Sequence, residues 1–388
     1  MNFKKILLSA IFLAFPWAAS AEIVPVTPHE TDAVSGVSPI LKSFLLTPTA
    51  ERLELFNNKD YRKKIYELRD AILTEFTWSC TEGEKGAFEL LISTKPDLSE
   101  PTDVLILPKT FDGNVIRAVN FRAGTRYFWQ IRCRKADGHV LVSSVSQFFT
   151  DEKMPRLMYI EGVGNVRDLG GSEALQGARV RQGMIFRSRA LVENSPDFVA
   201  DNQTPSKPIT QFARGKTAIV PAAANYASNV LNWKTEIDLR SDGELGNLKK
   251  SVVPGAQFLS IYIPEYNAIF SEKFSPTQQA MARAFRVFCK KENYPIVFHG
   301  AQGADRTGTL AFILNGLLGV PVDTLQKDWE LTALPHLRHQ DFFSLLAGFD
   351  AYGDKETPLY IKIERYLKTC GITQSEIEFY RALMLVNK

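Results

Sequence analysis

The stretch from Tyr294 to Leu310 constrains the fold more than any other part of this sequence. Its apolar residues 295–298 have the pattern of a buried strand, and they run directly into a loop of small residues that ends where Arg306 opens a helix. Backbone N–H groups in such a loop point inward and form a nest for an oxyanion. The helix start adds partial positive charge, and a planar guanidinium can hold two phosphate oxygens at once. The segment therefore predicts an α/β domain with a phosphate site.

Strand and helix patterns alternate from about residue 156 to the end, as in an α/β domain with a central sheet flanked by helices. Strands are predicted at 234–239, 258–263 and 295–298. Helices are predicted at 276–291, 306–318, 322–331, 359–369 and 374–385, the last one after a capping box formed by Thr373 and Glu376. Residues 192–222 are rich in Ser, Pro, Asn and Thr, and we interpret them as an insertion or a mobile loop between core elements.

The region from about 70 to 150 has an all-β pattern. Apolar and polar residues alternate through Phe76, Trp78 and Cys80, and again from Tyr127 to Cys133. Short strands at this spacing favour an N-terminal β-sandwich, which we place at 49–152. The charged stretch 53–69 fits a helix or an edge strand equally well. Residues 22–48, rich in Pro, Thr, Ser and Val, are expected to be a linker or a loosely attached strand.

Residues 1–21 have the pattern of an export signal. Lys4 and Lys5 form a positive start, 6–17 is mostly apolar, and Ala19-Ser20-Ala21 supplies the small residues of a cleavage site. The alternative is an uncleaved membrane anchor. Cleavage before Glu22 would give a secreted or periplasmic protein with no transmembrane segment in the mature chain.

The composition excludes several other classes of function. The formal net charge is only +3 over 388 residues and no long basic run occurs, which argues against a nucleic-acid partner. The five histidines, including His336 and His339, are few and scattered, so we predict no metal site and no cofactor.

Residues His299, Gly303, Arg306, Thr307 and Gly308 resemble, at the same spacing, the signature His-Cys-x-x-Gly-x-x-Arg-Ser/Thr-Gly of cysteine-dependent tyrosine and dual-specificity phosphatases. An Asp before the loop arginine resembles the bacterial, secreted tyrosine-phosphatase branch. The resemblance extends over 156–388 through motifs in the family order: Asn-Val-Arg-Asp-Leu-Gly-Gly at 165–171, Phe-Arg-Ser at 186–188, Ile-Asp-Leu-Arg-Ser at 237–241 and Asp-Trp-Glu-Leu-Thr at 328–332.

The resemblance implies a family mechanism for which this chain lacks the nucleophile. In the family, the loop cysteine thiolate attacks phosphorus, but Gly300 occupies its position. The resemblance therefore implies a pseudophosphatase that still binds a phosphorylated protein or a small phosphomonoester. The alternatives are an active tyrosine phosphatase, and an envelope interaction protein with a vestigial loop.

The resemblance also suggests roles for individual residues. Arg306 is expected to bind phosphate, with the rest of the pocket formed by Ala301, Gln302, Gly303, Ala304 and Asp305. Asp305 is either a general acid or a cap of the following helix. Asp238 is a candidate acid or a strand-end residue that pairs with Arg240 or Arg187. Residues expected to support the loop are His299, Thr307, Gly308, and an ion pair of Arg167 with Asp168.

The segment 124–132 resembles the sixth strand of fibronectin type III domains, in which a tyrosine and a tryptophan two residues later pack into the core. That likeness implies that Cys80 and Cys133 lie near the same end of the sandwich. A disulfide and two buried thiols both remain open. The domain shows no catalytic constellation, and we interpret it as a spacer or docking module.

Overall fold

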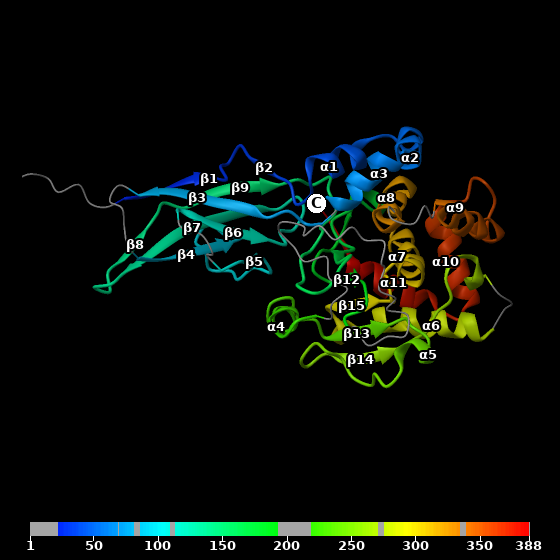
Figure 1. Ribbon diagram of the computed structural model, residues 1–388. Coiled ribbons are helices and arrows are strands. Elements are labelled where there is room, and N and C mark those ends of the chain that lie inside the picture. The colour runs from blue at the N-terminus through cyan, green and yellow to red at the C-terminus, as the bar shows by residue number, and fades with distance from the viewer. Residues whose placement is uncertain are drawn as a thin grey trace, which may run out of the picture.

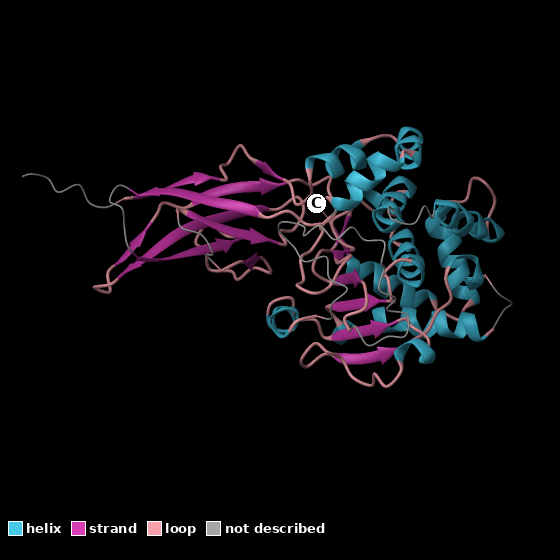
Figure 2. Ribbon diagram, in the orientation of Figure 1, coloured by secondary structure: helices cyan, strands magenta, loops and turns pink. Residues whose placement is uncertain are grey.

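A computed structural model describes residues 22–68, 70–80, 86–108, 113–192, 219–270, 275–333 and 339–387. It has a strand-rich N-terminal part and a C-terminal part in which helices cover a central sheet (Figures 1 and 2). The expected export signal at 1–21 lies outside these ranges. Within them, no helix combines the length and the apolar character needed to cross a membrane.

The N-terminal strands form two sheets. The first has the order β1-β3-β6-β5 and consists of β1 (Ile23–Thr27), β3 (Thr74–Cys80), β6 (Val115–Val119) and β5 (Leu105–Ile106). The second has the order β2-β9-β7-β4, with β8 beside β7, and consists of β2 (Ala33–Val34), β9 (Ser146–Thr150), β7 (Arg126–Lys135), β4 (Gly86–Ser93) and β8 (Val140–Val142).

Both sheets contribute side chains to one aromatic core. Phe76 of β3 meets Trp129 of β7 edge to face, with ring centroids 5.1 Å apart, and Tyr127 is fully buried beside them. This is the inward alternation that the sequence predicted for 127–133. No disulfide joins Cys80 to Cys133 in the structure; Cys133 is buried and Cys80 half-buried.

The segment 22–67 takes one of the two forms predicted for each of its parts, because 22–48 supplies strands and the charged stretch is helical, but 22–48 also forms a helix that was not predicted. It pairs β1 with β3 and then forms three helices, α1 (Pro39–Leu46), α2 (Thr49–Asn57) and α3 (Lys59–Glu67). Ser38 begins α1 because its hydroxyl accepts the N–H of Leu41. Phe44 and Phe56 belong to the same core as the C-terminal helices, so these helices pack with the C-terminal part.

A five-stranded sheet organises the C-terminal part. Its order is β10-β12-β15-β13-β14, and the strands are β10 (Arg167–Asp168), β12 (Ile185–Ser188), β15 (Ile296–His299), β13 (Thr235–Asp238) and β14 (Gln257–Ser260). All neighbours are parallel except β10, which is antiparallel to β12. The central strand, β15, is buried along its whole length, as expected for a parallel strand covered on both faces. A separate two-stranded sheet pairs β11 (Arg179–Val180) with β16 (Leu385–Val386).

Helices surround the sheet in the positions that the apolar periodicity predicted, with some additions. The structure has α5 (Asp242–Leu245), α6 (Pro276–Phe288), α7 (Asp305–Leu317), α8 (Val322–Ala333), α9 (His339–Gly348), α10 (Leu359–Thr369) and α11 (Gln374–Met384). The predicted capping box at the start of α11 is confirmed. Of the expected insertion at 192–222, residues 193–218 lie outside the described ranges, whereas Pro221 begins helix α4 (Pro221–Asn229).

Buried polar contacts fasten the N-terminal sheets to the C-terminal part. The guanidinium of Arg156 is fully buried and pairs with Asp103 at 2.8 Å and with Asp168 at 3.0 Å. It also donates to the carbonyl of Asn120 at 2.7 Å. One arginine thus joins a loop beside β5, the end of β6 and strand β10.

Candidate functional site

The loop 300–304 connects the carboxyl end of β15 to the first turn of α7. In the parts of the chain described, none of its N–H groups donates a hydrogen bond. The residue before the helix, Ala304, offers no side-chain cap to the helical N–H groups. Ligands of open α/β sheets bind at the carboxyl ends of parallel strands, and a helix N-terminus attracts anions. The loop therefore has the unclaimed donors that an oxyanion needs.

Gly303 is required by the path of the loop. Its φ is +67°, and a Cβ atom at this position would overlap the carbonyl oxygen of Ser188. Two side chains fix the backbone at Gly303. Its carbonyl oxygen accepts hydrogen bonds from Arg187 Nη2 at 2.7 Å and from Asn165 Nδ2 at 3.1 Å. Beside it, the Gln302 side chain accepts from Arg189 at 2.6 Å.

Asp328 of α8 binds two arginines near the loop, Arg167 and Arg187. One carboxylate oxygen accepts from Arg167 Nε and the other from Arg187 Nη1, each at 2.5 Å. Burial alone would raise the pKa of Asp328, but the two guanidinium groups outweigh it and the pKa is lowered. Burial and the charge of Arg167 lower the pKa of Arg187 to about 9.

The predicted ion pair between Arg167 and Asp168 is wrong. The side chains of adjacent residues in a strand point to opposite faces of the sheet. Arg167 therefore reaches Asp328, whereas Asp168 accepts from Arg156 and from the N–H groups of Gly170 and Gly183. Both residues are buried; Asp168 supports the backbone at Gly170 and Gly183, whereas Arg167 contacts Asn165, whose side chain binds the loop.

Position 300 has room for a side chain. A Cβ atom built on Gly300 would meet only the hydroxyl oxygen of Thr307, at 3.4 Å, which is an ordinary contact. Thr307 is fully buried, and its hydroxyl has no hydrogen-bond partner among the described residues. Thr307 was expected to hold the loop, but no hydrogen bond of its hydroxyl among the described residues supports that role.

His299 lies below the loop between two buried carboxylates. Its Nε2 is 3.0 Å from Glu236 Oε1, and its Nδ1 is 3.8 Å from Asp238 Oδ1. Burial works to lower the pKa of His299, but Asp238 and Glu236 outweigh it and the pKa is raised. The charged form of His299 is thus more favoured than that of a free histidine.

Asp238 makes the strand-end pair with Arg240 that was one of its two predicted roles. Both carboxylate oxygens accept from Arg240, at distances from 2.6 to 3.1 Å, and the carboxylate is fully buried. Burial alone would raise its pKa, but His299 and Arg240 outweigh it and the pKa is lowered. A carboxylate held ionised in this way is poorly placed to give a proton to a leaving group.

The fold also brings together three potential metal ligands that the sequence spacing did not reveal. Ligand atoms of Glu236, Asp238 and His299 lie within 4.8 Å of one another. Each carboxylate already has a partner, Arg240 for Asp238 and the Ser251 hydroxyl, at 2.5 Å, for Glu236. The group has the composition of an internal ion-pair network.

Arg306 faces a carboxylate that sequence reasoning missed. The two terminal nitrogens of its guanidinium both donate to Glu244 of α5, and Nη1 also donates to the Leu239 carbonyl at 3.2 Å. Its Nε lies 3.7 Å from Glu265, and the Tyr262 ring is 5.6 Å away. One edge of the guanidinium is thus bound to Glu244, while in the described chain the Nε atom donates no hydrogen bond.

The sequence did contain a signal for Glu244. Ser241 and Glu244 form a capping box at the start of α5, a pattern that can be found by spacing alone. What the spacing does not reveal is that the same carboxylate also reaches Arg306.

Asp305 occupies the first turn of α7, where the helix dipole stabilises a negative charge. The hydroxyl of Tyr266 donates to its Oδ1. The helix cap is Ala304, so the predicted capping role of Asp305 is not found. Asp305 and Tyr266 line a small hollow with Trp329 and Thr332, next to the loop.

Comparison with known proteins gives a family. The model of the tyrosine phosphatase family matches residues 158–201 and 216–386. A putative tyrosine-protein phosphatase of Cupriavidus necator, H16_A0669, is 24% identical over 188 residues, which cover 43% of this chain and 59% of that protein. The match thus spans less than two thirds of the relative.

Two solved structures also align. The core catalytic domain of the PP-IP phosphatase SIW14 from S. cerevisiae, in complex with citrate, has 15% identity and a TM-score of 0.27, and the match covers 47% of this chain and 89% of that one. A second Siw14 catalytic core has 15% identity and a TM-score of 0.26, with 47% and 88% covered. TM-scores of this size carry no inference about fold or function. The family match covers more than half of the sequence, and the chain therefore belongs to the tyrosine phosphatase family.

Proposed function

We propose that this chain is an exported pseudophosphatase, which binds a phosphorylated protein or a small phosphomonoester in the loop 299–308 without hydrolysing it. The observation that carries the proposal is that the N–H groups of 300–304 donate no hydrogen bond in the described chain, in a loop that begins at Gly300, a residue with no side chain to attack phosphorus. The Nε atom of Arg306 donates no hydrogen bond in the described chain, although the Glu265 carboxylate lies 3.7 Å from it, and this is the edge of the guanidinium that we assign to the ligand.

The C-terminal cysteines offer no substitute for the missing nucleophile. Burial raises the pKa of Cys289 to about 12 and that of Cys370 to about 11. Both thiols are therefore protonated near neutral pH, whereas phosphoryl transfer to sulfur needs a thiolate. Cys289 contacts carbonyls of α6 and α11, and Cys370 caps α10, so neither belongs to the loop.

Calorimetric titration with tungstate, a tetrahedral dianion, tests the binding claim. We expect saturable binding by the full chain and a loss of at least about tenfold in affinity in Arg306→Ala, since a charge-assisted bidentate contact is removed. Arg286→Ala is the matched control, because Arg286 forms an exposed pair with Glu376 and takes no part in the loop. Equal affinities in all three proteins would contradict the proposal.

Hydrolysis of para-nitrophenyl phosphate tests the absence of catalysis. We expect no turnover by the natural chain above that of Arg306→Ala, and measurable turnover by Gly300→Cys, because a Cβ atom at position 300 makes only an ordinary contact. Turnover by the natural chain would instead support the alternative, an active phosphatase that uses another group. In that case Asp305, held by the Tyr266 hydroxyl, is the residue to replace next.

The contact between Arg306 and Glu244 favours a second candidate, an envelope interaction protein with a vestigial loop. The carboxylate supplies the negative charge that a phosphate would otherwise bring to Arg306. Under this candidate tungstate produces no heat in the natural chain and none in Gly300→Cys, while the N-terminal sheets carry the binding function.

The N-terminal sheets are proposed to be a fibronectin type III-like sandwich that acts as a spacer or docking module. Packing of Tyr127 and Trp129 into the core between the two sheets supports this assignment. Export is proposed from residues 1–21, and mass spectrometry of the mature protein tests it. A first residue of Glu22 in the periplasmic or secreted fraction is expected, and retention of Met1 in a cytoplasmic fraction would contradict it.

A further inference from the structure

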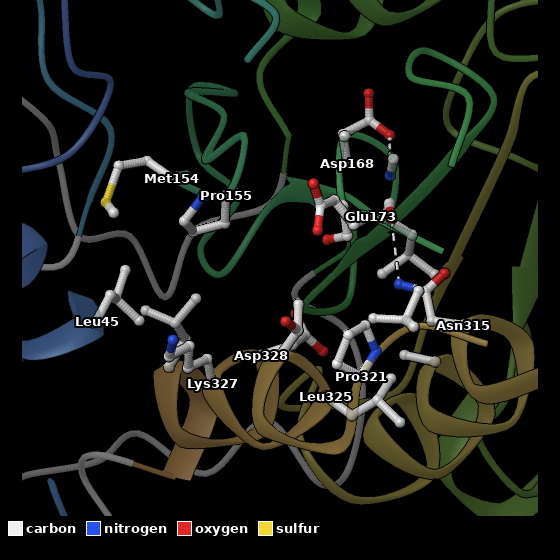
Figure 3. Close-up of a pocket in the computed structure, with 18 of the residues that line it drawn as sticks. Leu45, Met154, Pro155, Asp168, Glu173, Asn315, Pro321, Leu325, Lys327 and Asp328 are labelled. Carbon is white, nitrogen blue, oxygen red and sulfur yellow. Dashed lines mark hydrogen bonds between the residues drawn. The ribbon is translucent and has the colours of Figure 1, made fainter. Parts of the chain in front are cut away.

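A cavity of about 330 Å³ lies on the side of α7 that faces the N-terminal helices. It is bordered by α1, by the segment 152–155 that leads into the C-terminal part, by the turn after β10, and by α7 and α8. Figure 3 shows Leu45 and Met154 on one side of the open space and Asp168 and Asn315 on the other. Small-molecule sites have volumes of roughly 300–1,000 Å³, so this cavity lies at the lower end of that range.

The walls of the cavity are mixed, with slightly more apolar than polar surface. The aliphatic and aromatic side chains that line it include Leu45, Met154, Leu169, Phe312, Leu325 and Leu331, all of which are buried from solvent by the fold. An apolar ligand of matching size would gain dispersion contacts with these side chains.

Most of the charged side chains at the cavity already have partners of opposite charge. Glu152 pairs with Arg179 at 3.0 Å, and Lys327 pairs with Asp323 at 2.7 Å. A ligand with a net charge would disturb these pairs without gaining a free counterion from them. The lining therefore favours a neutral molecule.

Asp328 gives the cavity a polar anchor. Its side chain is 27% exposed, and each of its oxygens accepts one hydrogen bond, from Arg167 or from Arg187. A carboxylate oxygen can accept a second one. Because its pKa is lowered, Asp328 is an acceptor and not a donor, so the complementary ligand group is a hydrogen-bond donor.

We propose that this cavity binds a neutral amphipathic small molecule, with an apolar body between α1 and α7 and a hydrogen-bond donor directed at Asp328. The site is distinct from the loop 299–308, although both adjoin α7. Gly308 lines the cavity, and its N–H donates to the carbonyl of the loop residue Ala304. The proposal depends on the cavity alone and stands whether or not the loop binds phosphate.

N-phenyl-1-naphthylamine is a suitable probe, because it is neutral and apolar, carries one N–H donor and becomes fluorescent in apolar surroundings. We expect the full chain to bind it saturably. Thr324→Phe, which fills the cavity from α8, should weaken binding by at least about tenfold. Val322→Phe on the same helix is the matched control, because Val322 is exposed and does not line the cavity, and it should bind as the natural chain does.

Ser172→Phe fills the cavity from the opposite wall and keeps the test valid if Thr324→Phe does not fold. Circular dichroism and thermal unfolding establish which variants are folded. Absence of saturable binding by the natural chain would overturn the proposal. So would equal binding by the natural chain and by a folded cavity-filling variant, because the dye would then occupy another surface.

Discussion

At the scale of single residues, Gly300 and Gly303 show two different reasons for glycine in one loop. Gly303 is required by a left-handed φ and by the nearness of the Ser188 carbonyl, whereas Gly300 has space for a side chain. The sequence identified both positions through the family signature, but it could not distinguish a steric requirement from a missing nucleophile. That distinction depends on β12, which lies far from the loop in the sequence.

Gly303→Ala is therefore expected to destabilise the protein by about 2 kcal/mol or more, because the strain of a positive φ is added to a backbone overlap. Urea denaturation measures the change. Gly138→Ala is the control, since Gly138 has a φ of +88° with nothing within 4 Å of its missing Cβ, and it should cost only about 1 kcal/mol. Equal costs for the two variants would show that the Ser188 overlap is relieved by movement of the loop.

His299 should make stability depend on pH. Its pKa in the folded chain is raised above the ordinary 6.5, so its stabilising contribution is complete below that value and is lost as the pH rises through the folded pKa. We expect the difference in melting temperature between the natural chain and His299→Gln to be largest below pH 6.5 and to shrink at higher pH. The exposed His139 provides the control His139→Gln, which should leave the profile unchanged. A constant difference across the pH range would mean that folding leaves the pKa of His299 unchanged.

At the scale of elements, the long periodic helices were predictable and the short pieces were not. The predicted ranges for α7, α8, α10 and α11 are confirmed to within a few residues, because an apolar stripe marks α8, α10 and α11 and a long apolar run marks the buried α7. Strands β10 and β11 have two residues each, too few for any alternation to appear. Their position is determined by tertiary contacts such as those of Asp168 and Arg156.

Helix α5 is short, yet it determines the charge next to the loop, since Glu244 caps the helix and binds Arg306. Glu244→Gln should raise the affinity for tungstate severalfold, because it removes a negative charge that competes with the anion for the guanidinium. Titration calorimetry measures the change. Glu376→Gln, which removes a surface carboxylate paired with Arg286, should have no effect. Weaker tungstate binding by Glu244→Gln would show that Glu244 positions Arg306 for the ligand and does not compete with it.

At the scale of the whole molecule, buried ion pairs hold the two parts of the chain together. Arg156→Met should destabilise the protein by about 3–5 kcal/mol, because it leaves Asp103 and Asp168 as buried carboxylates without their common cation. The control Arg117→Met removes a surface pair with Glu75 and should cost less than about 1 kcal/mol. Chemical denaturation compares the two. A similar small cost for both would mean that water reaches Asp168 once Arg156 is gone.

The sequence suggested a division of the chain near residue 152, but side-chain contacts cross that boundary. Alternating strands and periodic helices indicate the type of each part, because these patterns are local. The packing of α1–α3 against the C-terminal part depends on pairs of residues more than 200 positions apart, such as Arg52 and Glu330. No pattern within a short window contains that information.

The contact between Arg52 and Glu330 has a consequence for any attempt to excise the phosphatase-type part. Both side chains are completely inaccessible to solvent, and their atoms are 2.6 Å apart. A truncated protein that starts at residue 156 would lose this arginine and the apolar cover that α1–α3 provide, and would leave Glu330 without its cation on newly bared α8. Such a fragment would be prone to aggregation, whereas one that keeps residues from 22 onward would retain the helices α1–α3 that cover this surface.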